Sequence, residues 1–169
     1  MQYKIIVAVC KDNGIGYKNT MPWKIKEDLR HFSKLTKGNG KNALIMGRNT
    51  WESLGKKPLP LRDHYILSST LEQNCDVSGV YICKNINEVD AVWGENPYEN
   101  VWIIGGSTIY RQFLEKNRVD ECIITYIDAD YECDTFFPEL LPSEWKLVDS
   151  KSMENSAGID ITVKQYKKY

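Results

Sequence analysis

The chain has 169 residues, of which 42% are hydrophobic and 27% are charged, and its formal net charge is −1. A chain of this length suits one domain that buries roughly two thirds of its unfolded surface. The balance of 22 basic against 23 acidic residues gives no bulk field that would attract nucleic acid or an anionic membrane. Any bound anion must therefore be held by a local cluster of donors.

The five cysteines are odd in number and include no C-x-x-C pair. This pattern fits neither a disulfide framework nor a zinc site, and we expect no bound metal. Cys10 and Cys122 fall in apolar runs and are expected to be small core residues in a reducing cytosol. The N-terminus lacks the apolar core of a signal peptide, and no apolar run reaches the roughly 18 residues that a membrane span needs. We therefore expect a cytoplasmic protein.

The elements begin with a continuous apolar run at residues 5–10, which predicts a central strand buried on both faces. Residues 11–22 are expected to form a loop, because two glycines and a proline break any strand ladder. The helix that follows is expected to end near residues 38–40, where two glycines stand. A second buried strand at 42–47 and a short helix at 50–54 come next.

The rest of the chain alternates strands with helices before it ends in a hairpin. The patterns predict strands at residues 64–69, 80–83, 101–104 and 122–127, and helices at residues 87–93 and 108–114. Two closing strands, 145–148 and 159–163, are separated by a turn-forming segment and predict an antiparallel hairpin at the sheet edge. This order favours a single α/β domain with a mixed, mostly parallel sheet flanked by helices.

One carboxylate stands on the apolar face of the first predicted helix. Asp28, Phe32 and Leu35 share that face at helical spacing, with Leu29 beside them. Glu27 lies with basic residues on the other face, as a solvated carboxylate does. A buried carboxylate is costly unless it is hydrogen-bonded, so a ligand presenting N–H donors is a natural partner for Asp28. The alternative is that Asp28 only stabilises the positive end of the helix dipole.

Two glycine-containing turns follow predicted strands, at the edge where α/β sheets bind their ligands. Gly47, Arg48 and Thr50 place backbone N–H groups, a guanidinium and a hydroxyl at a helix start, which suits a pyrophosphate and a further phosphate. Gly105-Gly106 also lies between a strand and a helix, where the absent side chains let the backbone approach a ligand. The alternatives are a turn with an ordinary surface arginine and a tight turn that binds nothing.

Four segments, at residues 12–16, 21–23, 46–55 and 103–110, together resemble the dihydrofolate reductase family in sequence and order. The resemblance covers nearly the whole chain and implies the fold of that family, with residues 42–98 as an adenosine-binding subdomain. It implies that NADPH reduces 7,8-dihydrofolate to 5,6,7,8-tetrahydrofolate for one-carbon metabolism and for thymidylate and purine synthesis. Antifolate inhibitors are then expected ligands, and the protein is expected to be a monomer.

The resemblance also assigns roles to single residues. Asp28 matches the acid that holds the pterin ring and raises the proton affinity of its N5, to which water delivers the proton. Thr125 matches a hydroxyl linked to that acid, and Arg62 matches the guanidinium that clamps the glutamate α-carboxylate of the substrate. The implied catalytic set is Asp28, Met21, Trp23 and Tyr110. The implied substrate-binding set is Ile6, Val7, Asp28, Leu29, Phe32, Leu59, Arg62, Ile104 and Thr125.

Cofactor contacts are implied at the strand ends and in the loop ahead of the first helix. Arg48 and Ser69 match contacts to the 2′-phosphate of the adenosine. Asp134 matches a loop acid that bonds the backbone near Gly16 when residues 14–21 close over the nicotinamide. The implied cofactor-binding set is Ala8, Ile15, Gly16, Gly47, Arg48, Asn49, Thr50, Leu67, Ser68, Ser69, Gly105, Gly106, Ser107, Thr108, Ile109, Tyr110 and Thr135.

Two other functions stay open on the sequence. The pyrimidine reductase of riboflavin synthesis has a similar fold and also uses NADPH, but it needs a site for a ribityl phosphate. A non-catalytic protein that binds NADPH or RNA could keep the scaffold alone. Asp28 in its Pro22-Trp23 context, together with Arg62, favours the folate enzyme over the pyrimidine reductase. The non-catalytic protein is disfavoured because every residue that the chemistry needs is present, and NADPH consumption on adding dihydrofolate would discriminate them.

Overall fold

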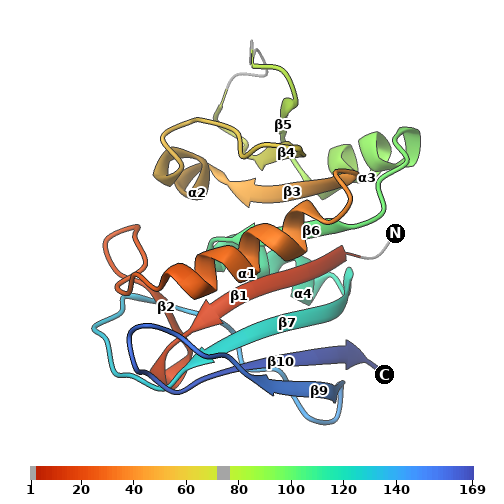
Figure 1. The fold of residues 1–169 in the computed structure, drawn as a ribbon. Coiled ribbons are helices and arrows are strands. Elements are labelled where there is room, and N and C mark those ends of the chain that lie inside the picture. The colour runs from red at the N-terminus through yellow and green to blue at the C-terminus, as the bar shows by residue number, and fades with distance from the viewer. Residues whose placement is uncertain (1–2, 72–76) are drawn as a thin grey trace.

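The computed structural model describes residues 3–71 and 77–169, which form a layered α/β structure (Figure 1). An eight-stranded sheet has the order β5-β4-β3-β6-β1-β7-β10-β9. Its strands are β1 (Tyr3–Val9), β3 (Asn42–Gly47), β4 (Arg62–Leu67), β5 (Val80–Cys83), β6 (Val101–Gly105), β7 (Val119–Ile127), β9 (Trp145–Ser152) and β10 (Ile161–Lys168). The helices are α1 (Lys26–Lys37), α2 (Arg48–Ser53), α3 (Ile86–Glu95) and α4 (Ser107–Glu115), with a 3-10 turn η1 (Lys11–Asn13). The expected fold class is confirmed.

β1 lies inside the sheet and pairs in parallel with β6 and β7. Its side chains alternate between two cores. Ile5 and Val7 join a cluster with residues of α3 and α4, whereas Ile6 joins a cluster against which Phe32 of α1 packs. In Figure 1, α1 crosses the near face of the sheet and α4 lies behind it. Both faces of β1 are therefore covered, which explains its unbroken apolar run.

The closing hairpin is confirmed at the sheet edge, but its strands are longer than the sequence predicted. β10 pairs antiparallel with both β7 and β9. β9 is exposed along almost its whole length after Trp145, so it carries little of the hydrophobic alternation from which a strand is predicted. Smaller differences occur elsewhere, since α2 begins at Arg48 and β4 at Arg62.

The loop expected at residues 11–22 contains a strand, so that part of the prediction was wrong. β2 (Gly14–Gly16) pairs antiparallel with β8 (Thr135–Phe136), which the sequence did not reveal. The glycines permit this pairing because the two segments lie very close together. A Cβ on Gly14 would lie 2.5 Å from the Cys133 sulfur, and one on Gly16 would lie 2.8 Å from the Thr135 hydroxyl oxygen. Gly14 and Gly16 therefore allow β8 to pair closely with β2.

Two further features of the fold are the positions of the cysteines and the character of the helices. Cys10 and Cys122 are buried, as expected of core residues, while Cys75 lies outside the described residues. The cysteines within those residues are free, and the same part of the chain contains no cluster of His, Cys, Asp and Glu side chains that could hold a metal ion. None of the helices in residues 3–71 and 77–169 has the length and apolarity needed to cross a membrane.

Candidate active site

The carboxyl ends of the parallel strands meet at one edge of the sheet, and the candidate site is built there. The strand register places Met46 opposite Gly105 and Gly47 opposite Leu67, so the ends of β3, β4 and β6 are neighbours. A Cβ on Gly106 would lie 4.0 Å from the Thr50 hydroxyl oxygen, which brings the starts of α2 and α4 together. Open α/β sheets bind ligands at such an edge.

Asp28 is buried near the start of α1, with 7% of its surface exposed. Burial raises the pKa of its carboxyl to about 6, and the nearby Trp23 side chain opposes that rise. Among the described residues, no cation lies within ion-pair distance of Asp28. The sequence prediction that this acid points inward is therefore confirmed. An acid in this setting is a strong acceptor for a ligand that brings its own N–H donors.

The other three residues of the implied catalytic set differ in their surroundings. Trp23 is buried beside Tyr131, and its indole N–H makes no hydrogen bond of standard geometry within the described residues. Met21 is 47% exposed on the loop ahead of α1. The Tyr110 hydroxyl donates to the Ile6 carbonyl at 3.0 Å, and burial raises its pKa far above the ordinary value, so the phenol stays protonated. Tyr110 therefore links α4 to β1.

The apolar residues predicted to bind the substrate are only partly brought together. Ile6, Phe32, Leu59 and Ile104 belong to one cluster. Leu29 is 45% exposed, so it stands at the rim of that group. Val7 packs into the core on the opposite face of the sheet, because successive residues of a strand point to opposite faces. Only the backbone of Val7 is thus available on the Ile6 face.

Thr125 is buried on β7 directly opposite Ala8 of β1. Thr125 therefore lies on the strand that neighbours β1. A link between this hydroxyl and the Asp28 carboxylate stays a prediction.

Arg62 is buried at the start of β4, with 9% of its surface exposed. Its Nε donates to the Pro60 carbonyl at 2.9 Å, and one terminal nitrogen donates to the Thr36 hydroxyl at 3.0 Å. Burial lowers the pKa of the guanidinium. Within the described residues no acid pairs with it. The protein thus orients this cation and leaves part of its donor fork for an anion.

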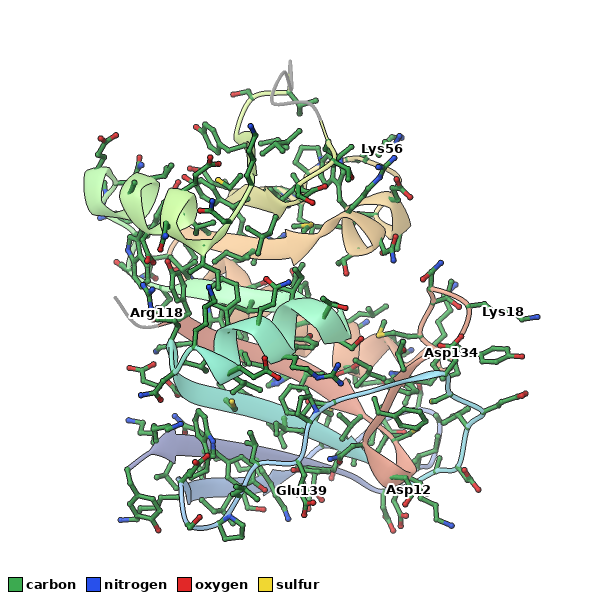
Figure 2. The ribbon with its side chains drawn as sticks, turned by 180° about the vertical axis from the view of Figure 1, so that it is seen from behind. Asp12, Lys18, Lys56, Arg118, Asp134 and Glu139 are labelled. Atoms are coloured by element: carbon green, nitrogen blue, oxygen red, sulfur yellow. The ribbon has the colours of Figure 1, made fainter. Side chains whose placement is uncertain are left out.

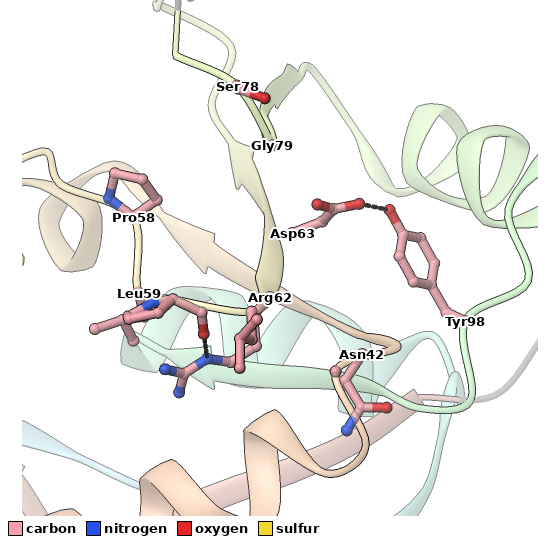
Figure 3. A pocket seen from close by; sticks show the side chains of 11 residues that line it. Asn42, Pro58, Leu59, Arg62, Asp63, Ser78, Gly79 and Tyr98 are labelled. Atoms are coloured by element: carbon pink, nitrogen blue, oxygen red, sulfur yellow. Dashed lines mark hydrogen bonds between the residues drawn. The ribbon is translucent and has the colours of Figure 1, made fainter.

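Figure 3 shows a cavity of about 390 Å³ beside the start of β4, with Leu59 and Arg62 on its lower rim. On its other side Asp63 accepts a hydrogen bond from the Tyr98 hydroxyl. Asp28, Thr125 and Tyr110 do not line this cavity.

The predicted phosphate donors gather around a residue that the sequence analysis missed. The Thr70 hydroxyl accepts from Arg48 at 3.4 Å and lies 3.3 Å from the Ser68 hydroxyl. The Arg48 Nε also donates to Glu52 at 2.9 Å, one helical turn away. The run of three hydroxyl residues, Ser68-Ser69-Thr70, after a strand end was the available signal for Thr70. Glu52 had no signal beyond its i,i+4 spacing.

Two glycines of the predicted cofactor set lie in close contact with side chains of α4. Gly105 has a φ of +121°, and the peptide bond between it and Gly106 is cis. A Cβ on Gly105 would lie 3.3 Å from the Tyr110 hydroxyl, and one on Gly47 would lie 3.0 Å from a side-chain carbon of Ile109. Glycine at these positions therefore lets the Ile109 and Tyr110 side chains of α4 pack directly against the strand ends.

The remaining cofactor residues lie around the same edge. Ala8 and Ile15 are half-buried on β1 and β2, and Thr135 pairs with Gly16. Leu67 and Ile109 are buried. The more open positions are Asn49, Ser69, Ser107 and Thr108.

The loop contact expected near Gly16 is present. The Asp134 carboxylate accepts from the Lys18 backbone N–H at 3.0 Å, and its own N–H donates to the Gly16 carbonyl at 2.9 Å. Figure 2 shows Lys18 and Asp134 at the same end of the molecule, on segments far apart in the sequence. The expected link between this acid and the active-site loop is therefore confirmed.

A mostly parallel sheet with glycine turns, a buried carboxylate and a hydroxyl cluster at its carboxyl edge defines the protein as an α/β protein with a ligand site at that edge. Comparison with known proteins identifies the family. The dihydrofolate reductase family profile matches residues 2–168, so the chain belongs to the dihydrofolate reductase family. The protein therefore reduces 7,8-dihydrofolate to 5,6,7,8-tetrahydrofolate.

Relatives named dihydrofolate reductase come from insects and from a bacterium. The Drosophila melanogaster protein is 38% identical over 83% of this chain and 81% of its own length. The Aedes albopictus protein is 35% identical over 99% of this chain and 97% of its own. The Staphylococcus aureus protein is 36% identical over 89% of this chain and 86% of its own.

Proposed function

We propose that NADPH is the hydride donor and that the residues around Arg48 select it. The Arg48 guanidinium lies at the start of α2, beside the Thr70 and Ser68 hydroxyls. A guanidinium with flanking hydroxyls matches the charge and acceptors of a 2′-phosphate. This cluster is the single observation that carries the choice of NADPH over NADH.

The strand ends fit the rest of such a cofactor. Gly47 and Gly105 have no room for a side chain without displacing Ile109 or Tyr110, so the strand ends lie close against α4. The Gly106 carbonyl and the first turn of α4 follow directly. When bound, the cofactor supplies the hydride. The chain's own residues bind it, orient it and, through the loop at residues 14–21, exclude bulk water.

Asp28 is proposed to bind the pterin ring and to tune its basicity. Its ionised carboxylate accepts hydrogen bonds from the ring N3 and 2-amino group, which stabilises positive charge on the pterin and favours protonation at N5. Water delivers that proton. Because the pKa of Asp28 is about 6, the carboxylate is mostly ionised at neutral pH. Thr125 is proposed to hold the same amino group.

Arg62 is proposed to bind the α-carboxylate of the substrate's glutamate. Its buried guanidinium is oriented by Pro60 and Thr36, and the Thr36 hydroxyl in turn donates to the Phe32 carbonyl at 2.7 Å. This chain of hydrogen bonds joins β4 to α1. The carboxylate clamp and the apolar wall at Phe32 are therefore held as one unit.

The decisive experiment compares three substrates in the presence of NADPH. Dihydrofolate should be reduced rapidly, a dihydropterin without the glutamate more weakly, and a ribitylaminopyrimidine phosphate not at all. Turnover of the phosphate compound, or equal use of NADH and NADPH, would contradict the proposal. We further propose a cytoplasmic monomer that binds antifolates in the dihydrofolate site and binds no nucleic acid.

A further inference from the structure

Two cysteines face each other beneath the active-site loop. The sulfur of Cys10, at the end of β1, lies 3.6 Å from the sulfur of Cys133, in the segment before β8. These residues are separated by 123 positions in the sequence. Cys83 and Cys122, the other cysteines within the described residues, have no such sulfur neighbour there.

The backbone beside the Cys10 sulfur is held by two hydrogen bonds. The Cys10 N–H donates to the Gly14 carbonyl at 2.9 Å, and the Lys11 N–H donates to the Ala129 carbonyl at 3.1 Å. A Cβ on Gly14 would lie 2.5 Å from one sulfur and 3.0 Å from the other. The glycine therefore leaves the space in which the two thiols meet.

We propose that Cys10 and Cys133 form an oxidisable dithiol site that hydroperoxides convert to an intramolecular disulfide. A disulfide bond is about 2.05 Å long, so the sulfurs must approach by about 1.5 Å, which a change of side-chain torsion can supply. Cys133 is half-exposed whereas Cys10 is 4% exposed. The oxidant therefore reaches Cys133 first, and Cys10 is placed to resolve the product.

The chemistry balances with one hydroperoxide per disulfide. The Cys133 thiolate attacks the terminal peroxide oxygen, the O–O bond breaks, and the leaving oxygen takes up a proton as water or alcohol. The sulfur is then a sulfenic acid. The Cys10 thiolate attacks that sulfur, the S–S bond forms, the S–O bond breaks, and the hydroxide leaves as water with the second thiol proton.

The surroundings make this reaction slow. Burial raises the pKa of Cys133 to about 11, and the hydrogen bond to Cys10 acts in the same direction. Most of the site is therefore thiol at neutral pH, and the reaction belongs to the slow end of the seconds-to-hours range of disulfide formation.

The crosslink would join the end of β1 to the segment that carries Asp134. That segment holds the active-site loop through Gly16 and Lys18. The same cluster includes Trp23. A disulfide here would restrain the loop relative to β1 and lower kcat, a consequence that rests on the proposed function, whereas the crosslink itself does not.

The test treats the reduced full chain with hydrogen peroxide, alkylates the remaining thiols, and maps the peptides without reduction. The expected result is a loss of two of the five thiols and one linked peptide pair containing Cys10 and Cys133. Cys133→Ala should abolish the pair, whereas Cys83→Ala, which removes a buried thiol elsewhere, should leave it intact. Dithiothreitol should reverse the change.

Three results would overturn the proposal: alkylation of both Cys10 and Cys133 after peroxide, over-oxidation of Cys133 without a link, or pairing of either one with another cysteine. The wild-type peptide map decides between these outcomes even if a variant fails to fold. Steady-state assays of the reduced and crosslinked protein then report on the loop. A reduced protein without reductase activity would count against the proposed function and leave the crosslink standing.

Discussion

The proposed substrate side of the site, around Asp28 and Arg62, differs from the proposed cofactor side, around Arg48, in how its charged groups are placed. On the substrate side, Asp28 and Arg62 are 7% and 9% exposed, and neither has an oppositely charged partner among the described residues. On the cofactor side, the Arg48 and Glu52 side chains are 48% and 42% exposed and pair with each other. An isolated buried charge destabilises the fold, whereas an exposed pair changes the stability little.

This difference in burial indicates which residues, when substituted, should change ligand binding most. A ligand that satisfies a buried charge regains a large part of its desolvation cost, so removing that charge should strongly reduce affinity or turnover. A ligand that binds Arg48 must instead compete with Glu52 and with water. The effects of substitution should therefore be large on the substrate side and moderate on the cofactor side.

The largest effect is expected for Asp28→Asn. The amide cannot stabilise positive charge on the pterin, so kcat/KM at neutral pH should fall by about 10²-fold or more, the range of acid–base effects. Activity should partly return in acid, where N5 is protonated before the hydride arrives. The measurement is a pH profile of kcat/KM for both proteins. Identical profiles for wild type and variant would contradict the role proposed for Asp28.

The same substitution should stabilise the fold at neutral pH. The folded-state pKa of about 6 lies above the ordinary value of 3.8, so ionisation of Asp28 favours unfolding. The penalty is absent below about pH 3, where both states are protonated, and is complete above the folded pKa, where it reaches about 3 kcal/mol. Denaturant unfolding should thus show Asp28→Asn more stable than wild type at pH 7 and equal to it at about pH 3. Equal stability at both pH values would contradict this.

The next largest effect is expected for Arg62→Leu. Loss of a charge-assisted pair with the glutamate carboxylate should raise the KM for dihydrofolate by roughly 10²-fold with little change in kcat. A dihydropterin without glutamate should show no penalty. Arg30→Leu, on the exposed face of α1, is the control. A similar loss with both substrates would indicate a disturbed site and not a lost carboxylate clamp.

A moderate effect is expected for Arg48→Leu. NADPH should be preferred over NADH by one to two orders of magnitude in the wild type, from charge-assisted bonds of about 1.5–3 kcal/mol. The substitution should remove most of that preference by weakening NADPH alone, and Glu52→Gln should increase the preference slightly. The measurement is kcat/KM with each cofactor, with Arg111→Leu as the control. If the ratio of kcat/KM with NADPH to kcat/KM with NADH did not change, the 2′-phosphate would not be bound by Arg48.

The smallest effect on turnover is expected for Glu27→Gln, next to Asp28. Its carboxylate is not simply solvated as predicted, because it accepts hydrogen bonds from the Ser156 N–H and hydroxyl at 3.2 to 3.4 Å. The substitution should leave kcat and KM unchanged and lower the melting temperature slightly, because it weakens a contact with the β9–β10 connection. A large loss of turnover would show that α1 transmits effects to Asp28.

The sequence predicted the sheet and its helices because each element carries its own periodic signal. Asp28 was found by the same route, since a polar residue on an apolar helical face is visible in the spacing alone. β2 and β8 were missed because their pairing depends on glycines that admit a distant segment, which no local pattern reports. The partners of Arg62 were missed for a similar reason. Thr36 lies 26 residues away, and nothing in the spacing brings it to β4.

The sheet order has a consequence for how the chain is made. β1 precedes both of its partner strands in the chain, since Ile5 is paired with Ile103 on one side and Cys122 on the other. At ordinary translation rates β1 stays unpaired for roughly ten seconds before either partner strand has been synthesised. Such non-local parallel pairing is slow to form and leaves an aggregation-prone strand exposed in the meantime. The nascent chain is therefore expected to depend on ribosome-associated chaperones until β7 and β10 are complete.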